Sequence, residues 1–399
     1  MRTRITIGVT AAGLAAFALL YAPQPVLPQL AAQFRLSPGD ASMAVSVATA
    51  ALAVMVVPLA VLSEVAGRRP VMIGSLVIAV LAGLALPFAP TFPGLLALRI
   101  VQGAAIAGLP ATAMAYLAER LGTVGLGAAI GAMVAGNSMG GMTGRLAAGI
   151  GADAFGWRTG LGLVTALSAL CAVIMIVTLP RGGKPERGPV IGGIRAALRE
   201  PRLLALYAVA ALAMGSFVAL YNAVGFRLAA PPLSVAPGLA SLIFLSYAIG
   251  GTCSAVAGRI ADRVGRVPIQ VGGLLLAVLG ALLTLPDSVL TVALGIAIFT
   301  GGFFAAHSVA SGWVSATAPA KARGQASGLY LCAYYLGSSI GGTAGTAVYG
   351  AMGWTTLIAV IACWLAMAGA ATAYAGLRVT NTRSSTQNLS TNTGAPLSR

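Results

Sequence analysis

The segment Asp262-Arg263-Val264-Gly265-Arg266-Val267-Pro268 decides the fold, because a related segment stands one half-chain earlier. The earlier copy reads Glu64-Val65-Ala66-Gly67-Arg68-Arg69-Pro70, and each copy joins two long apolar runs. Further pairs keep nearly the same spacing: Gly136, Gly140, Gly141 and Gly144 match Gly337, Gly341, Gly342 and Gly345, and Trp157 matches Trp354. The chain therefore consists of two halves with the same pattern.

The composition excludes an ordinary soluble protein. A soluble domain averages roughly 25% charged residues, whereas this chain has 8% charged and 58% hydrophobic residues. The net charge of +16 indicates basic loops at one membrane face and not a nucleic-acid partner. The four cysteines lie in apolar stretches without a CxxC or His/Cys cluster, so we expect no metal site, disulfide framework or cofactor.

The apolar runs predict an all-α membrane protein, since about 20 helical residues cross a bilayer. We expect twelve transmembrane helices at 5–32, 40–63, 70–89, 93–118, 124–151, 157–179, 202–226, 237–258, 267–286, 289–315, 324–350 and 354–377. They form two pseudo-symmetric six-helix halves, residues 1–180 and 202–378. A cytoplasmic linker at 181–201 joins the halves, and a disordered cytoplasmic tail is expected at 379–399.

The basic residues predict the orientation. If the N-terminus is cytoplasmic, most of the 24 Lys and Arg residues fall on the cytoplasmic side, as membrane proteins require. The exceptions are Arg35, Arg99, Arg145, Arg158 and Arg227. Both termini are therefore expected in the cytoplasm, and the arginine-rich composition favours a bacterial inner membrane.

Several motifs resemble those of the major facilitator superfamily. The loop Gly258-Arg259-Ile260-Ala261-Asp262-Arg263-Val264-Gly265-Arg266 is similar to its signature loop. The first-half copy departs from that pattern at Ala60, Glu64 and Val65, which predicts weaker stabilisation of one conformation by this loop. The resemblance implies that the loops act in conformational change through Glu64, Gly67, Arg68, Arg69, Gly258, Asp262, Arg263, Gly265 and Arg266.

Two helices carry further resemblances. Arg99, Gln102 and Gly103 match the RxxQG pattern of the superfamily, and 127–149 resembles the glycine-rich helix of its antiporters and exporters. Gly141 and Arg145 stand where that helix often has proline and glycine. The glycines at Gly136, Gly140, Gly141, Gly144, Gly337, Gly341 and Gly345 let helices approach closely, for static packing or for a rocking motion.

Short stretches are most similar to the bacterial drug-efflux branch that contains AraJ and YnfM. These stretches are Tyr21–Pro25, Gly136–Gly141, Ala305–Ser308 and Tyr334–Ser338. The resemblance implies the twelve-helix fold and proton-coupled antiport, with export of drug-like or sugar-like molecules by alternating access.

If the superfamily geometry holds, a central cavity is expected to bind the substrate through Tyr21, Gln24, Arg145, Tyr221, Asn222 and His307. An ionisable group at membrane depth is costly and is a functional candidate. Arg145 either bonds to backbone carbonyls or lines the cavity as a cation for an anionic or polar substrate. His307 is the only histidine, and it either packs by a hydrogen bond or titrates during transport.

No carboxylate is predicted in the middle of a span, where proton-coupled carriers commonly place one. If protons are the coupling ion, His307 is the first candidate and Glu119 and Asp153 are the next. The missing carboxylate leaves open a uniporter or an uptake carrier without proton coupling. The expected partners are membrane lipid, a small-molecule substrate and coupling protons; no nucleic acid is expected, and the protein is expected to be a monomer.

Two other classes of protein are disfavoured. A membrane receptor or sensor would usually add a soluble output domain, which the short segment after Arg378 cannot provide. The GxSxG pattern at Gly136–Gly140 resembles the nucleophile elbow of hydrolases, but the elbow needs a strand–turn–helix context and this pattern lies in an apolar helix. We therefore expect no enzyme.

Overall fold

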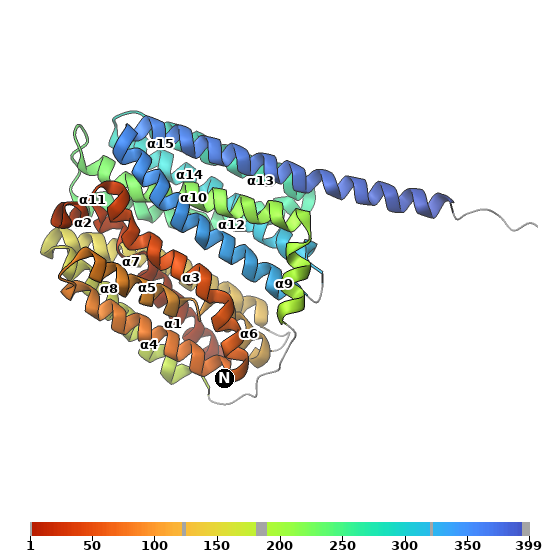
Figure 1. Ribbon diagram of the computed structural model, residues 1–399, viewed down its shortest axis with the longest axis horizontal. Coiled ribbons are helices and arrows are strands. Elements are labelled where there is room, and N and C mark those ends of the chain that lie inside the picture. The colour runs from red at the N-terminus through yellow and green to blue at the C-terminus, as the bar shows by residue number, and fades with distance from the viewer. Residues whose placement is uncertain (1, 122–124, 181–189, 320–321, 393–399) are drawn as a thin grey trace, which may run out of the picture.

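The computed structural model describes residues 2–121, 125–180, 190–319 and 322–392. These residues form helices and connecting turns and no strand, which confirms the all-α class. The first half forms the lower part of Figure 1 and the second half the upper part. Part of the predicted linker, 181–189, lies outside the described residues, and the domain boundaries stay predictions.

The elements of the first half are α1 (Arg2–Tyr21), η1 (Gln24–Val26), α2 (Leu27–Phe34), α3 (Pro38–Ala66), α4 (Arg68–Ala85), η2 (Leu86–Phe88), α5 (Phe92–Ile106), α6 (Pro110–Leu121), α7 (Leu126–Phe155) and α8 (Trp157–Thr178). Those of the second half are α9 (Val190–Leu198), α10 (Pro201–Ala229), α11 (Pro237–Ala240), η3 (Ser241–Ser246), α12 (Tyr247–Val264), α13 (Arg266–Leu283), α14 (Val289–Thr317) and α15 (Arg323–Asn392).

The repeat is visible in the backbone at four glycines. Gly67 and Gly265 have φ of 94° and 99° and separate α3 from α4 and α12 from α13. Gly156 and Gly353 both have φ of 83° and precede Trp157 and Trp354. Positive φ is cheap only for glycine, so each half turns its chain at equivalent places because it keeps glycine there.

The described residues contain nine helical segments that are long and apolar enough to cross a membrane. This number differs from the predicted twelve for physical reasons. Gly353 interrupts α15, which therefore holds two predicted spans in one element. The predicted span 93–118 is divided between α5 and α6, and α7 is rich in glycine, which lowers its hydropathy. The exact number twelve stays a prediction.

The last helix continues to Asn392 and leaves the bundle (Figure 1), where the sequence predicts a disordered tail. No glycine or proline stands between Arg378 and Asn392, so nothing in this segment interrupts the helix that the preceding span begins.

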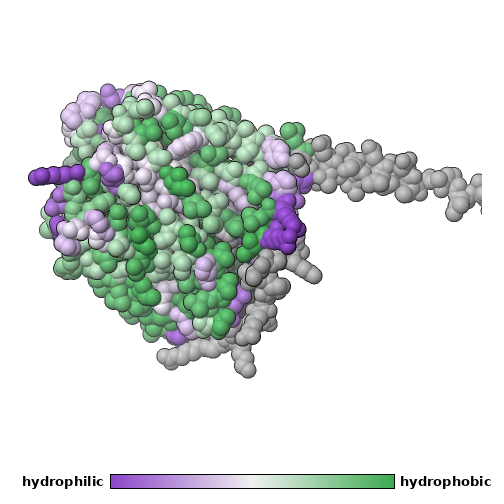
Figure 2. Space-filling model, viewed as in Figure 1, coloured by the Kyte–Doolittle hydropathy of each residue, from purple (hydrophilic) through white to green (hydrophobic). Residues whose placement is uncertain are grey.

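The outer surface of the bundle is apolar. Figure 2 shows hydrophobic residues over much of the visible face and hydrophilic ones towards its two ends. Leu81, Leu170 and Leu279 are each about 60% exposed. An exposed apolar surface of this extent needs lipid as its solvent. The chain is therefore a multi-pass membrane protein.

Candidate functional site

The site begins at a break in the first helix. Pro23 has no backbone N–H, so it cannot bond to the carbonyl of Leu19, and α1 ends at Tyr21. Arg99 of α5 is completely buried and donates to the carbonyls of Leu19 and Leu20, and to the carbonyl of Ala44 at 2.6 Å. The guanidinium therefore satisfies backbone groups that the break leaves open, and the break is stable inside the bundle.

Beyond the break, Gln24 joins the two halves of the protein. Its Oε1 accepts from Nε of Arg145 at 2.6 Å, and its Nε2 donates to Oδ1 of Asn222 at 2.7 Å. Gln24 and Arg145 are 1% exposed, and Asn222 is completely buried. Since Asn222 belongs to α10 in the second half, this polar chain crosses the interface between the halves.

Aromatic rings surround the Arg145 guanidinium. Its Cζ lies 4.3 Å from the ring centre of Tyr21, 4.6 Å from that of Tyr247 and 5.3 Å from that of Phe244. Nη1 donates to the carbonyl of Gly141 at 2.7 Å. The ion pairs among the described residues involve Arg68 and Arg227 and not Arg145. Arg145 is therefore a buried cation held by neutral groups.

A second cluster continues from Tyr221 towards His307. The Tyr221 hydroxyl lies 2.5 Å from Oγ of Ser246 and 2.7 Å from Oγ1 of Thr300. Phe217 stacks on Phe303 with ring centres 4.1 Å apart, and Phe303 stacks on His307 at 5.8 Å. The Tyr330 hydroxyl is hydrogen-bonded to Nδ1 of His307 at 2.9 Å. His307 is thus connected through aromatic rings to Tyr21, Gln24, Arg145, Tyr221 and Asn222, which we call the central cluster.

Five of the six predicted substrate residues come together: Tyr21, Gln24, Arg145, Tyr221 and Asn222. His307 is separated from these five residues by the stacked rings of Phe217 and Phe303. Sequence reasoning missed Phe217, Phe244, Tyr247, Ser246 and Thr300. In the sequence, the feature that could have indicated these residues is the presence of aromatic and hydroxyl side chains within the predicted spans 202–226, 237–258 and 289–315.

The two acidic coupling candidates lie near helix ends, and Asp153 stands eight residues after Arg145 in the same helix. Glu119 is near the end of α6 and pairs with Arg68. Asp153 is near the end of α7, where its Oδ2 lies beside Gly238. Within the described ranges, no group of three or more His, Cys, Asp or Glu residues is placed to hold a metal ion.

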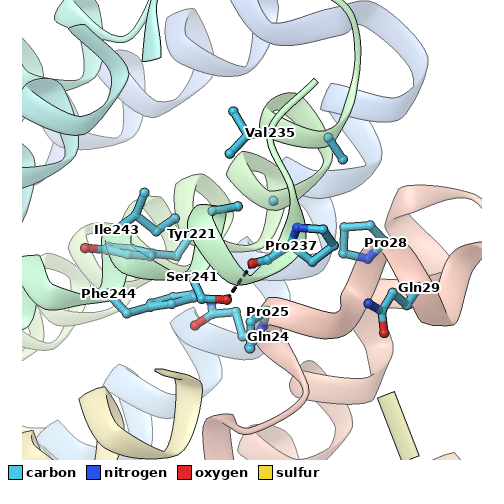
Figure 3. Close-up of a pocket in the computed structure, with 13 residues that line it drawn as sticks. Gln24, Pro25, Pro28, Gln29, Tyr221, Val235, Pro237, Ser241, Ile243 and Phe244 are labelled. Carbon is cyan, nitrogen blue, oxygen red and sulfur yellow. Dashed lines mark hydrogen bonds between the residues drawn. The ribbon is translucent and has the colours of Figure 1, made fainter. Parts of the chain in front are cut away.

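A pocket adjoins the polar chain (Figure 3). It has an empty volume of about 430 Å³, including its open mouth, and lies between η1, α2, α10 and η3. Gln24, Tyr221 and Phe244 line it together with Pro25 and Pro28. Its inner wall is therefore made by residues of the central cluster.

The two signature loops differ in their contacts. Arg68 donates to Glu119 at 3.0 Å and to Oγ of Ser63 at 2.6 Å, and Glu64 lies 3.8 Å from it. Arg69 donates to the carbonyl of Leu179 at 2.9 Å. In the second half Asp262, Arg263 and Arg266 are exposed and form no ion pair among the described residues. The first-half loop, with the less typical sequence, is the better anchored one.

Arg68→Ala is therefore expected to lower the stability of the protein by about 1–2 kcal/mol, because several hydrogen bonds of a charged group are lost together. Arg266→Ala is the matched control in the other half, and its effect is expected to stay below about 0.5 kcal/mol. Thermal unfolding of the purified protein in detergent measures both. Equal shifts for the two variants would show that the first loop is not preferentially anchored.

Two long halves of apolar helices with a buried polar junction between them are typical of a membrane transporter. The chain belongs to the major facilitator superfamily, which matches residues 9–251 and 212–399. The inferred relationship to this superfamily is thereby confirmed, and membership indicates a transporter and not an enzyme.

Two relatives support this assignment. The MFS-type transporter YybF of Bacillus subtilis strain 168 is 38% identical over 91% of this chain and 92% of its own length. The inner membrane transport protein YnfM of Escherichia coli K12 is 38% identical over 92% of this chain and 88% of its own length. The similarity to YnfM agrees with the resemblance to that protein in the short stretches.

Solved structures share the fold. A bacterial homologue of the human lysosomal transporter Spinster has a TM-score of 0.75 at 17% identity and covers 94% of this chain and 95% of its own. The nucleoside transporter NupG has a TM-score of 0.76 at 12% identity and covers 93% and 99%. At such identities the likeness concerns the fold alone.

Proposed function

We propose that the protein is a monomeric secondary active transporter that works by alternating access. In this proposal it exports small organic molecules across a bacterial inner membrane in exchange for protons, with both termini in the cytoplasm. The observation that carries the proposal is the polar chain Arg145–Gln24–Asn222, which links the two halves deep inside the bundle. Transporters with repeated halves bind their substrate at such a junction.

Contacts between the halves support alternating access. A Cβ on Gly39 would lie 3.0 Å from Cα of Ala347, and one on Gly149 would contact Ser241. These contacts belong to the end of the bundle with α2 and α11, opposite the end with the N-terminus and α6 (Figure 1). With the predicted orientation, the two halves touch at the outer end, as is expected of an exporter in the state that loads its substrate from the cytoplasm.

Proton coupling is assigned to His307 in this proposal. It is the only histidine, and Tyr330 bonds its Nδ1. Every acidic residue of the described chain lies at a helix end or in a loop, so His307 is the described side chain inside the bundle whose unperturbed pKa lies nearest to neutral pH. The same distribution of acids favours the second candidate, a uniporter without proton coupling.

Flux in proteoliposomes distinguishes the two functions. For the exporter, an imposed pH gradient drives uphill movement of a panel of organic solutes. His307→Ala is expected to abolish the gradient-driven part and to retain downhill exchange, because it removes the proton carrier and leaves the central cluster intact.

Ser308→Ala, on the same helix, is the matched control and keeps its coupling. Flux that ignores the gradient in the wild type would exclude the proton antiporter and leave the uniporter. Absence of any flux across the panel would favour a sensor.

A further inference from the structure

The charge of Arg145 has no counter-charge in the described structure. A guanidinium carries five N–H donors. Of these, Nε bonds to Gln24 and Nη1 to Gly141, and both acceptors are neutral. Burial of an unpaired charge is costly, and aromatic faces offset only part of that cost. A single negative charge beside Arg145 would therefore stabilise the site.

A second buried donor lies on the other side of Gln24. Nδ2 of Asn222 is buried and has no hydrogen-bond partner among the described residues, while Oδ1 of the same amide accepts from Gln24. Gln24 thus stands between an unneutralised cation and an unsatisfied N–H donor. Its side-chain amide occupies the position in which a carboxylate group would meet Arg145 of the first half and Asn222 of the second half.

The residues around Arg145 indicate the chemical character of the rest of the ligand. Tyr21, Phe244 and Tyr247 surround the guanidinium, and the stacked rings of Phe217 and Phe303 follow. Pro25 and Pro28 line the adjoining pocket. Such a lining suits an aromatic or aliphatic body and gives few partners to the many hydroxyls of a sugar.

We propose that Arg145, with Asn222 opposite it, binds the carboxylate of an amphipathic organic acid, and that Gln24 occupies the carboxylate position when the site is empty. The inference rests on the proposed transport function for its biological meaning. It narrows the substrate from drug-like or sugar-like molecules to monoanions with an apolar body.

The first test compares 3-phenylpropionate with 3-phenylpropionamide, which have similar shapes and differ in charge. Binding to the purified full chain is measured by calorimetry. The wild type is expected to bind the carboxylate about tenfold more tightly than the amide, a step of roughly 1.4 kcal/mol. Arg145→Gln is expected to remove the preference. Arg158→Gln, at an exposed arginine bonded to the Pro87 carbonyl, keeps it.

Equal binding of the acid and the amide by the wild type would overturn the assignment. So would a carboxylate preference that survives in Arg145→Gln, or the absence of carboxylate binding at millimolar concentrations. Transport of neutral solutes without a carboxylate preference would remove this inference and leave the transport function. Arg145-dependent carboxylate binding without flux of any solute would support this inference and would contradict the transport function.

The second test does not need a folded Arg145 variant. Gln24→Glu places a carboxylate beside Arg145, where it can also accept from Nδ2 of Asn222 after rotation of that amide. This variant is expected to raise the apparent melting temperature and to weaken 3-phenylpropionate binding at least tenfold, since its own carboxylate fills the site.

Gln24→Leu is the control of similar size, which lacks both hydrogen bonds and is expected to lower the melting temperature. A Gln24→Glu protein that melts below the wild type, or that binds the acid as tightly, would show that no anion belongs at this position.

Discussion

Gly140→Ala is expected to destabilise the protein by about 3 kcal/mol or more and to remove most of the folded material, because overpacking against a backbone cannot be relieved by a rotamer change. A Cβ on Gly140 would overlap the carbonyl oxygen of Leu14 and lie 2.7 Å from its carbonyl carbon. The first helix would have to move away along its whole contact with α7. Folded yield after gel filtration and unfolding in detergent measure the effect.

Gly131→Ala is the matched control, since Gly131 lies in the same helix and a Cβ there would meet no atom within 4 Å. Alanine is the better helix former by about 1 kcal/mol, so this variant is expected to be neutral or slightly stabilising. Comparable losses in the two variants would mean that α7 is sensitive to any added side chain, and the packing explanation would fail.

The same arrangement recurs in the second half. Gly136, Gly140 and Gly144 face Thr10, Leu14 and Ala18 of α1, and Gly337, Gly341 and Gly345 face Ala211, Gly215 and Ala219 of α10. Both glycine rows therefore pack helices inside one half and not across the interface. This position supports static packing within two rigid halves over a hinge role in the rocking motion.

Arg99→Gln is expected to cost more than about 3 kcal/mol, because three backbone carbonyls lose a charged donor and each unsatisfied buried group costs about 1–3 kcal/mol. The carbonyls belong to Leu19, Leu20 and Ala44, and Arg99 also bonds to Gln102. Unfolding in detergent measures the loss. The break at Pro23 is also expected to relax, which would move Gln24 away from Arg145 and Asn222.

Arg99→Lys is expected to recover only part of this loss, since an ammonium lacks the planar fork that reaches several carbonyls at once. Arg158→Gln, which loses one exposed hydrogen bond, is the control and should cost less than about 0.5 kcal/mol. Full stability of Arg99→Lys would show that charge alone, and not the geometry of the guanidinium, holds the break.

Some features of the site were predictable from single residues. Arg145 is conspicuous because arginine is rare at membrane depth, whereas Tyr21, Gln24, Tyr221 and Asn222 were expected only through the resemblance to the superfamily. The contacts of Tyr247 and Phe244 with Arg145 were not predictable. An aromatic residue in an apolar helix carries no sign of whether it faces lipid, a neighbouring helix or a cation.

The sequence by itself determined the all-helical membrane fold, the repeat of two halves and the turns at Gly67 and Gly265, because these depend on local hydrophobicity and backbone freedom. Only the tertiary structure decided that Gln24 meets Arg145 and Asn222, and that Arg145 lacks a counter-charge among the described residues. The contacts of a buried polar group depend on how distant helices rotate and cross, and hydrophobic periodicity does not encode that angle.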